Sequence, residues 1–180
     1  MVTATADRLP AFPARRVDER LLSTACSLRA ATLDDVPFLR SLYASFRAAE
    51  LAPIPWSLHE KQAFLNQQFD LQHRYYVATF PKADFVMIEK DGVAIGRLYI
   101  DLSTDLWHII DIGLLPEYRG HGIGHSLLAA IKAAAVTATN SSIALHVDKA
   151  NVRAYTLYLS LGFIVIDATD THMYMRWFAH

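Results

Sequence analysis

The feature that most constrains this 180-residue chain is a glycine-rich turn, Arg119-Gly120-His121-Gly122-Ile123-Gly124. An apolar, strand-like run (residues 106–115) and a proline precede it, and an alanine- and leucine-rich segment follows it. Glycine has no Cβ, so the backbone can approach a ligand closely and adopt conformations closed to other residues. The first N–H groups of a helix have no internal partners, and with the helix dipole they favour an anion. The turn therefore predicts a cradle for phosphate groups.

Two familiar phosphate loops do not match this turn. It lacks the Gly-Lys-Ser/Thr ending of a nucleoside triphosphatase, so no side chain is placed to hold magnesium or a terminal phosphate. A dinucleotide-binding fingerprint needs Gly-x-Gly-x-x-Gly early in a βαβ unit, with an acid about twenty residues later. Here the glycines are spaced two apart behind Arg119 and come late in the chain. We therefore interpret the turn as a pyrophosphate cradle of another kind.

Composition places the chain among globular domains. A hydrophobic fraction of 53% and a charged fraction of 19% are not those of a disordered chain, and 180 residues suit one domain. The formal net charge of −1 gives no basic field for nucleic acid, and no apolar stretch reaches the length of a membrane span. The single cysteine, Cys26, suits a reducing compartment. We therefore expect a buried structural thiol and a cytoplasmic protein that binds neither nucleic acid nor membrane.

The first 26 residues differ from the rest of the chain. They carry two prolines and four arginines interspersed with acids, and no apolar region follows the basic residues. This pattern argues against a secretory signal, and the acids argue against a transit peptide. We expect residues 1–26 to be an extension, either flexible or packed on the domain's edge, and residues 27–180 to form the domain.

The remaining residues show alternating strand and helix patterns. Thr32 and Ser57 each begin a capping-box sequence, and Asp91-Gly92 between two apolar runs is a strong hairpin signal. The sequence therefore predicts an α/β fold, a single domain with a mixed β-sheet flanked by helices. Helices are expected after Thr32, after Ser57, after the glycine-rich turn and over 151–161. The expected strands are 27–31, 85–89, 93–101, 106–115, 143–147, 163–167 and 173–178.

A second motif, residues 151–163, has the pattern Asn-x-x-Ala-x-x-Leu-Tyr-x-x-x-Gly-Phe. The glycine-rich turn resembles the acetyl-CoA-binding motif Arg/Gln-x-x-Gly-x-Gly/Ala of the GNAT N-acetyltransferases, and this second pattern is similar to that family's second motif. Both occur in the family's order and spacing, so residues 27–178 resemble a GNAT domain. The departures are mild: Val152 and Arg153 stand where small residues or proline are common, and Arg153 either contacts the donor's phosphate or adenine region or lies on a solvated helix face.

The resemblance implies acetyl-CoA as the acyl donor and an amine as the acceptor. It places the donor's pyrophosphate on the backbone N–H groups of the turn and its pantetheine arm along the end of the preceding strand, like an added strand. It also implies that Asn151 and Tyr158 lie near the reacting end of the donor. The residues expected to bind the donor are Leu114, Leu115, Arg119, Gly120, His121, Gly122, Ile123, Gly124, Asn151 and Tyr158.

Direct acetyl transfer needs groups that move protons, because an amine attacks only when neutral and its pKa is near ~10.4. The resemblance implies that Tyr158 protonates the departing thiolate; the alternative is an aromatic that packs its helix. His108 is a candidate base, or a strand histidine bonded to a neighbouring carbonyl. Strand alternation places Asp111 on the opposite face from His108, where it either binds the substrate amine or pairs with a structural cation. The expected catalytic residues are Tyr158, His108 and Asp111.

The acceptor is the least determined part of this prediction. We expect a primary amine on a small molecule; a protein amine and a non-catalytic acyl-CoA-binding module remain alternatives. The aromatic residues Trp56, Tyr75, Tyr76 and Trp107 either line the acceptor pocket or belong to the core. His121 and His125 lack a third ligand at suitable spacing, so no metal is expected. Family members are often dimers, which leaves a homodimer open.

Overall fold

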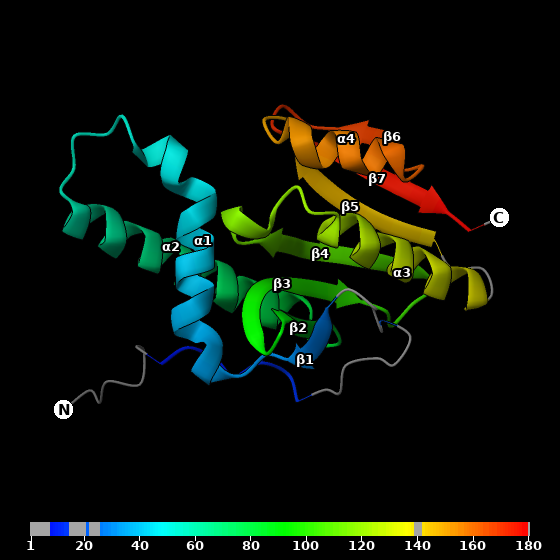
Figure 1. Ribbon diagram of the computed structural model, residues 1–180, viewed down its shortest axis with the longest axis horizontal. Coiled ribbons are helices and arrows are strands. Elements are labelled where there is room, and N and C mark those ends of the chain that lie inside the picture. The colour runs from blue at the N-terminus through cyan, green and yellow to red at the C-terminus, as the bar shows by residue number, and fades with distance from the viewer. Residues whose placement is uncertain (1–7, 15–20, 22–25, 139–141, 180) are drawn as a thin grey trace.

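The computed structural model describes residues 8–14, 21, 26–138 and 142–179. Seven strands form one sheet in the order β1-β2-β3-β4-β5-β7-β6, with four α-helices packed around it (Figure 1). The predicted fold class, one mixed sheet flanked by helices, is confirmed. The strands are β1 (Ser27–Ala30), β2 (Asp84–Lys90), β3 (Val93–Asp101), β4 (Leu106–Leu114), β5 (Ser142–Asp148), β6 (Ile164–Ala168) and β7 (His172–Phe178). The helices are α1 (Val36–Leu51), α2 (Leu58–Thr79), α3 (Ile123–Thr137) and α4 (Val152–Ser160), with 3-10 turns at Leu33–Asp35 and Pro116–Tyr118.

The capping box at Ser57 and the turn at Asp91-Gly92 form as the sequence predicts. Ser57 caps α2 by accepting a hydrogen bond from the Glu60 N–H, and the Glu60 carboxylate accepts one from the Ser57 N–H in return. Asp91 and Gly92 both have positive φ, at 51° and 77°, which is the backbone of a tight hairpin turn between β2 and β3. These contacts fix where α2 starts and how the central hairpin pairs.

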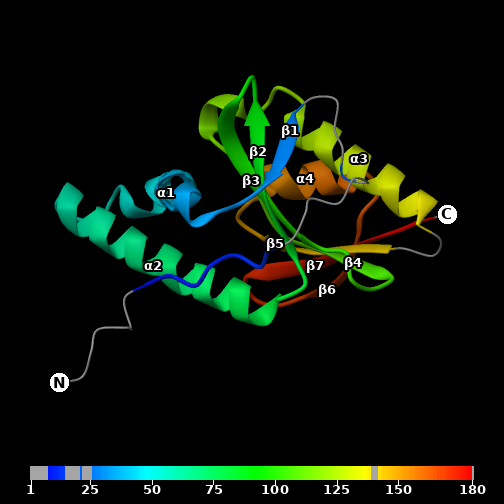
Figure 2. The same ribbon diagram turned by 90° about the horizontal axis from the view of Figure 1, so that it is seen from below.

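The sheet separates two hydrophobic cores. Helices α1 and α2 cover one face, and α3 and α4 cover the other (Figures 1 and 2). Leu39 of α1 and Phe69 of α2 are buried in the core on the first face, and Leu127 and Leu128 of α3 are buried on the second. A functional group carried by a strand can therefore face either the α1–α2 side or the α3–α4 side.

The strands β4 and β5 are the sheet's one parallel pair, and they pair over only part of their length. The register joins Leu106 with Ser142 and ends where Ile109 pairs with Leu145. Beyond that point β4 continues to Leu114 and β5 to Asp148 without pairing with each other, so the two strands diverge. The facing backbone edges of both strands therefore lack a strand partner in this gap, which can accept an extended ligand.

Part of the N-terminal segment packs against α2. Phe12 is buried in the core on the α1–α2 side, and its ring meets that of His73 at a centroid distance of 4.7 Å. The His73 Nε2 atom lies 2.7 Å from the carbonyl oxygen of Pro10. These contacts attach residues 10–12 to the domain; residues 1–7, 15–20 and 22–25 lie outside the described residues. Among the described helices, none is long and apolar enough to cross a membrane.

Candidate functional site

The glycine-rich turn ends at the N-terminus of α3 as predicted. Gly120 and Gly122 have φ values of 83° and 79°, a left-handed conformation that glycine adopts without steric cost. The first helical hydrogen bond runs from the Ser126 N–H to the Gly122 carbonyl at 2.9 Å. The preceding N–H groups of residues 123–125 therefore have no acceptor within the helix, which is the arrangement an anion needs.

Two guanidinium groups flank this turn. The Nη2 atom of Arg153, at the start of α4, lies 3.1 Å from the position that a Cβ on Gly120 would occupy. Arg119 donates from Nε to the Leu114 carbonyl at 2.8 Å, while its buried Nη2 has no hydrogen-bond partner among the described residues. Burial and then the charge of Arg153 lower the pKa of Arg119. Two positive charges beside a helix N-terminus, one of them with an unpartnered N–H group, are an arrangement that suits an anion.

Leu114 and Leu115 lie at the end of β4, where that strand has diverged from β5. The Leu115 N–H bonds to Ile95 on β3, so this side of β4 is satisfied. The other side faces the gap. These two predicted residues thus lie between the glycine-rich turn and the point where the strands part.

Tyr158 projects from α4 into the core on the α3–α4 side. Its ring packs against Phe163 at 5.7 Å, and its hydroxyl makes no hydrogen bond with the described residues. Burial raises the pKa of the phenol to about 12, and the Asp111 carboxylate adds to this shift. The phenol is therefore neutral at physiological pH and can donate a proton. Asn151, predicted nearby, caps α4 through its Oδ1, which accepts from the Ala154 N–H at 3.2 Å.

The prediction that His108 and Asp111 face opposite sides of the sheet is wrong. The pairing of β3 with β4 shifts between Tyr99, which pairs with Asp111, and Ile100, which pairs with Ile109. This β-bulge adds a residue to β4 and reverses the alternation after it. Both side chains consequently face α2: the His108 ring lies 5.6 Å from Phe80, and the Tyr76 hydroxyl lies 3.3 Å from the Asp111 carboxylate.

Asp111 pairs with a buried cation. The Arg97 Nη2 atom donates to Oδ2 of Asp111 at 2.7 Å, and the Arg97 side chain is only 1% exposed. The same Nη2 donates to Gln72 Oε1 at 2.9 Å, and the guanidinium lies over the Tyr99 ring. Two roles were predicted for Asp111, binding the substrate amine or pairing with a structural cation, and the structure shows it paired with the cation Arg97. Sequence reasoning missed Arg97, because its partner lies on a neighbouring strand.

His108 lies at the point where β4 and β5 part, one residue before the last paired position of β4. Its ring nitrogens make no hydrogen bond with the described residues; the ring contacts Phe80 and, at 5.8 Å, the ring of His146. Burial lowers the pKa of His108 below its usual 6.5, His146 lowers it further, and Asp101 opposes both. The imidazole is therefore neutral at pH 7 and free to accept a proton.

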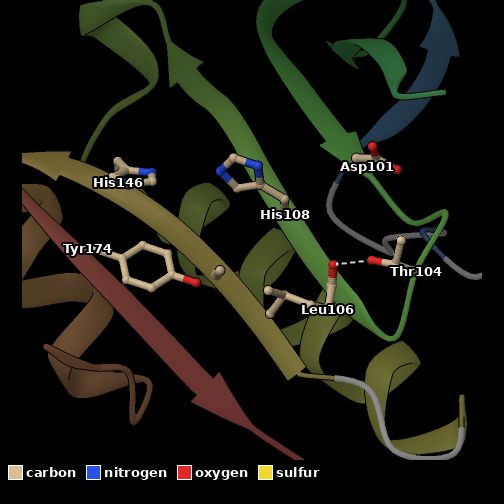
Figure 3. Close-up of a pocket in the computed structure, with 7 residues that line it drawn as sticks. Asp101, Thr104, Leu106, His108, His146 and Tyr174 are labelled. Atoms are coloured by element: carbon tan, nitrogen blue, oxygen red, sulfur yellow. Dashed lines mark hydrogen bonds between the residues drawn. The ribbon is translucent and has the colours of Figure 1, made fainter. Parts of the chain in front are cut away.

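His146 on β5 completes this end of the site and was not predicted. Figure 3 shows His108 and His146 turned toward each other across the space between β4 and β5, with Tyr174 of β7 beside them. A sequence signal existed: Ile143, Leu145 and Val147 alternate with Ala144 and His146, so strand periodicity places His146 on the opposite face from these three branched apolar residues.

The four aromatic candidates for the acceptor pocket have different positions. Tyr76 faces Asp111 on the α2 side, and Trp107 is buried in the core on the α3–α4 side. Trp56 and Tyr75 are 42% and 60% exposed. The structure therefore brings Tyr76 alone of these four near His108 and Asp111.

The chain matches the family model described as Acetyltransferase (GNAT) family over residues 40–163. It belongs to the GNAT acetyltransferase family.

Named relatives agree with this membership. Over 108 residues the chain is 32% identical to the mycothiol acetyltransferase of Streptomyces griseus, which covers 58% of this chain and 34% of that protein. The chain thus spans about a third of the length of this relative. Among solved structures, PaiA N-acetyltransferase from Thermoplasma acidophilum in complex with coenzyme A has a TM-score of 0.64 at 17% identity, covering 85% of this chain and 98% of that one. The ribosomal-protein-S18-alanine N-acetyltransferase from Escherichia coli has a TM-score of 0.55 at 18% identity, covering 85% and 93%. These two structures show a shared fold.

Proposed function

We propose that this chain is an acetyl-CoA-dependent N-acetyltransferase that passes acetyl directly to a primary amine of a small molecule. The observation that carries the proposal is the gap between β4 and β5. It begins where Ile109 pairs with Leu145 and opens toward the glycine-rich turn, with Tyr158 on one face and His108 on the other.

The residues along this gap fit a coenzyme A thioester. The N–H groups at the start of α3, with Arg119 and Arg153, suit the pyrophosphate, and the unpaired edge of β4 near Leu114 suits the amides of the pantetheine arm. Bound there, acetyl-CoA supplies an activated acyl carbon. The remaining donor contacts assigned to Gly120–Gly124, Leu115 and Asn151 belong to the same proposal.

The chain's own residues would move the protons. An acceptor ammonium has a pKa near ~10.4 and must lose a proton before its nitrogen attacks. His108 is neutral and lies on the α2 side of the gap, so it takes that proton directly or through water. Tyr158 lies on the other side and gives its phenolic proton to the leaving thiolate sulfur. Asp111, held by Arg97, presents a carboxylate on the same face as His108 and favours a cationic amine there.

An assay of thiol release from acetyl-CoA tests this proposal. Release should require a primary amine, and a tertiary amine of similar size should give none because it cannot form an amide. Acetyl-CoA binding without release in the presence of small amines or peptides would contradict the proposal and favour a non-catalytic acyl-CoA-binding module.

A further inference from the structure

A cavity of about 350 Å³ lies on the α2-side face of the sheet, at the paired end of β4 and β5. This volume is at the low end of the range that small-molecule sites occupy. Figure 3 shows its walls, which come from four neighbouring strands and the β3–β4 connection. The lining residues are Asp101, Thr104, Leu106, His108, Ala144, His146 and Tyr174.

The strand register explains why these side chains share one face. Asp101 pairs with His108 across β3 and β4, His108 pairs with Ala144 across β4 and β5, and His146 pairs with Tyr174 across β5 and β7. Side chains of directly paired residues point to the same side of a sheet. The cavity therefore extends from the candidate base, His108, away from the donor's gap.

The charged side chains that line the cavity are of one sign, negative. Its lining contains one carboxylate, Asp101, and no lysine or arginine. Burial lowers the pKa of both histidines, so at pH 7 they are neutral. Arg176, which pairs with Ala144 on this face, does not line the cavity: its Nη2 donates to Ser142 Oγ at 2.9 Å and its guanidinium lies over the Phe178 ring. A negatively charged group in this cavity would therefore meet Asp101 without a compensating cation among the described lining residues.

We infer that this cavity holds the body of the acceptor, and that the acceptor is a compact primary amine carrying no carboxylate or phosphate. The inference rests on the proposed function and names its substrate class. The rings of His108, His146 and Tyr174, with centroid spacings of 5.8 and 4.9 Å, provide an apolar and polarisable wall for the amine's carbon skeleton. Asp101 attracts the cationic amine and repels an anionic substituent.

Matched amine and amino-acid pairs test this substrate class. Phenethylamine is compared with phenylalanine, and agmatine with arginine, because each pair differs by one carboxylate. In the thiol-release assay, kcat/KM for the amine should exceed that for its amino acid by about tenfold or more. Calorimetric titration of the same compounds into protein saturated with coenzyme A should give the same order of affinity.

Substitutions of lining residues test whether the preference for an amine over its amino acid arises in this cavity. Asp101→Asn should reduce the amine-to-amino-acid ratio several-fold, whereas Asp105→Asn, an exposed acid that does not line the cavity, should leave it unchanged. Tyr174→Ala should raise KM for the amine about tenfold while the Kd for acetyl-CoA stays the same.

Other results would overturn the inference. Equal or better use of the amino acids, or an unchanged ratio in Asp101→Asn, contradicts the assigned charge selection. A peptide with a free N-terminus that reacts faster than both amines would show that the acceptor is a polypeptide; this contradicts the small-molecule acceptor but leaves acetyl transfer from acetyl-CoA standing. Absence of acetyl-CoA binding removes the inference together with the proposed function.

Discussion

At the scale of single residues, Tyr158 and His108 are prepared for opposite proton transfers. Burial raises the pKa of the Tyr158 phenol to about 12 and lowers that of the His108 imidazole below 6.5. At neutral pH the Tyr158 phenol is protonated and can donate a proton, and the His108 imidazole is neutral and can accept one. This difference matches the proposed roles of a general acid and a general base on the two faces of the same gap.

Replacing Tyr158 with phenylalanine removes the hydroxyl and keeps the ring that packs on Phe163. We expect kcat to fall by about tenfold or more, because positioned acid catalysis contributes roughly 10²–10⁴-fold. The Kd for acetyl-CoA, measured by calorimetry, should stay within a few-fold. Tyr155→Phe in the same helix is the control and should keep its turnover. A Tyr158→Phe protein with unchanged kcat would show that the phenol plays no part in proton transfer.

The low pKa of His108 predicts the pH dependence of turnover. A base works when neutral, so kcat should fall at low pH with a midpoint below 6.5 and should level off as the pH rises above that midpoint. His108→Gln should lower kcat and abolish this acid limb, whereas His59→Gln on the exposed start of α2 should retain it. An identical acid limb in His108→Gln would assign the titration to another group.

At the scale of elements, the bulge in β4 determines what the site contains. It places Asp111 on the α2 side with His108, and there Asp111 meets Arg97 of β3 and Tyr76 of α2. Without the bulge, the carboxylate would lie among the apolar side chains under α3, where an unpaired charge is costly. The irregularity thus joins β3, β4 and α2 beside the gap through one ion pair and one hydrogen bond.

Arg97→Met tests this ion pair. The change leaves Asp111 without its cation, so we expect the free energy of unfolding to fall by roughly 3–5 kcal/mol, as for other broken buried pairs. In the double variant Arg97→Met/Asp111→Asn the uncompensated charge is also gone, and part of this loss should return. Urea denaturation of the wild type, of the single variants Arg97→Met and Asp111→Asn, and of the double variant measures the loss and the recovery. A loss below about 1 kcal/mol in Arg97→Met would mean that water solvates Asp111 adequately.

The elements themselves were largely predictable, because their signals are local. Capping at Ser57, the Asp91-Gly92 turn and the two glycine-containing motifs each depend on a few adjacent residues. The bulge was not predictable, because it is a mismatch in pairing between β3 and β4 that neither strand shows alone. Arg97 was missed for the same reason: its burial depends on a partner fourteen positions away.

At the scale of the whole molecule, the sheet divides the proposed chemistry between its two faces. The proposed donor contacts come from α3, α4 and the end of β4, and the two sequence motifs cover the starts of both helices. The acceptor cavity comes from β3, β4, β5 and β7, whose lining residues are dispersed from Asp101 to Tyr174. The sequence motifs therefore led to the proposed donor side. The proposed acceptor side, which includes His146, became apparent only from the register of four strands.

Calorimetric titration with acetyl-CoA measures whether the glycine-rich turn binds the donor's phosphates. Gly122→Asp adds a negative charge at the N-terminus of α3, where a new Cβ meets nothing within 4 Å. Gly92→Asp is the matched control, since Gly92 has nearly the same φ, 77° against 79°, and equal space in a distant hairpin.

We predict saturable binding by the wild type and by Gly92→Asp, and a Kd at least about tenfold weaker in Gly122→Asp. Equal affinity in all three proteins would mean that the turn does not hold the donor's phosphates, and no binding by the wild type at millimolar acetyl-CoA would mean that the chain does not use this donor.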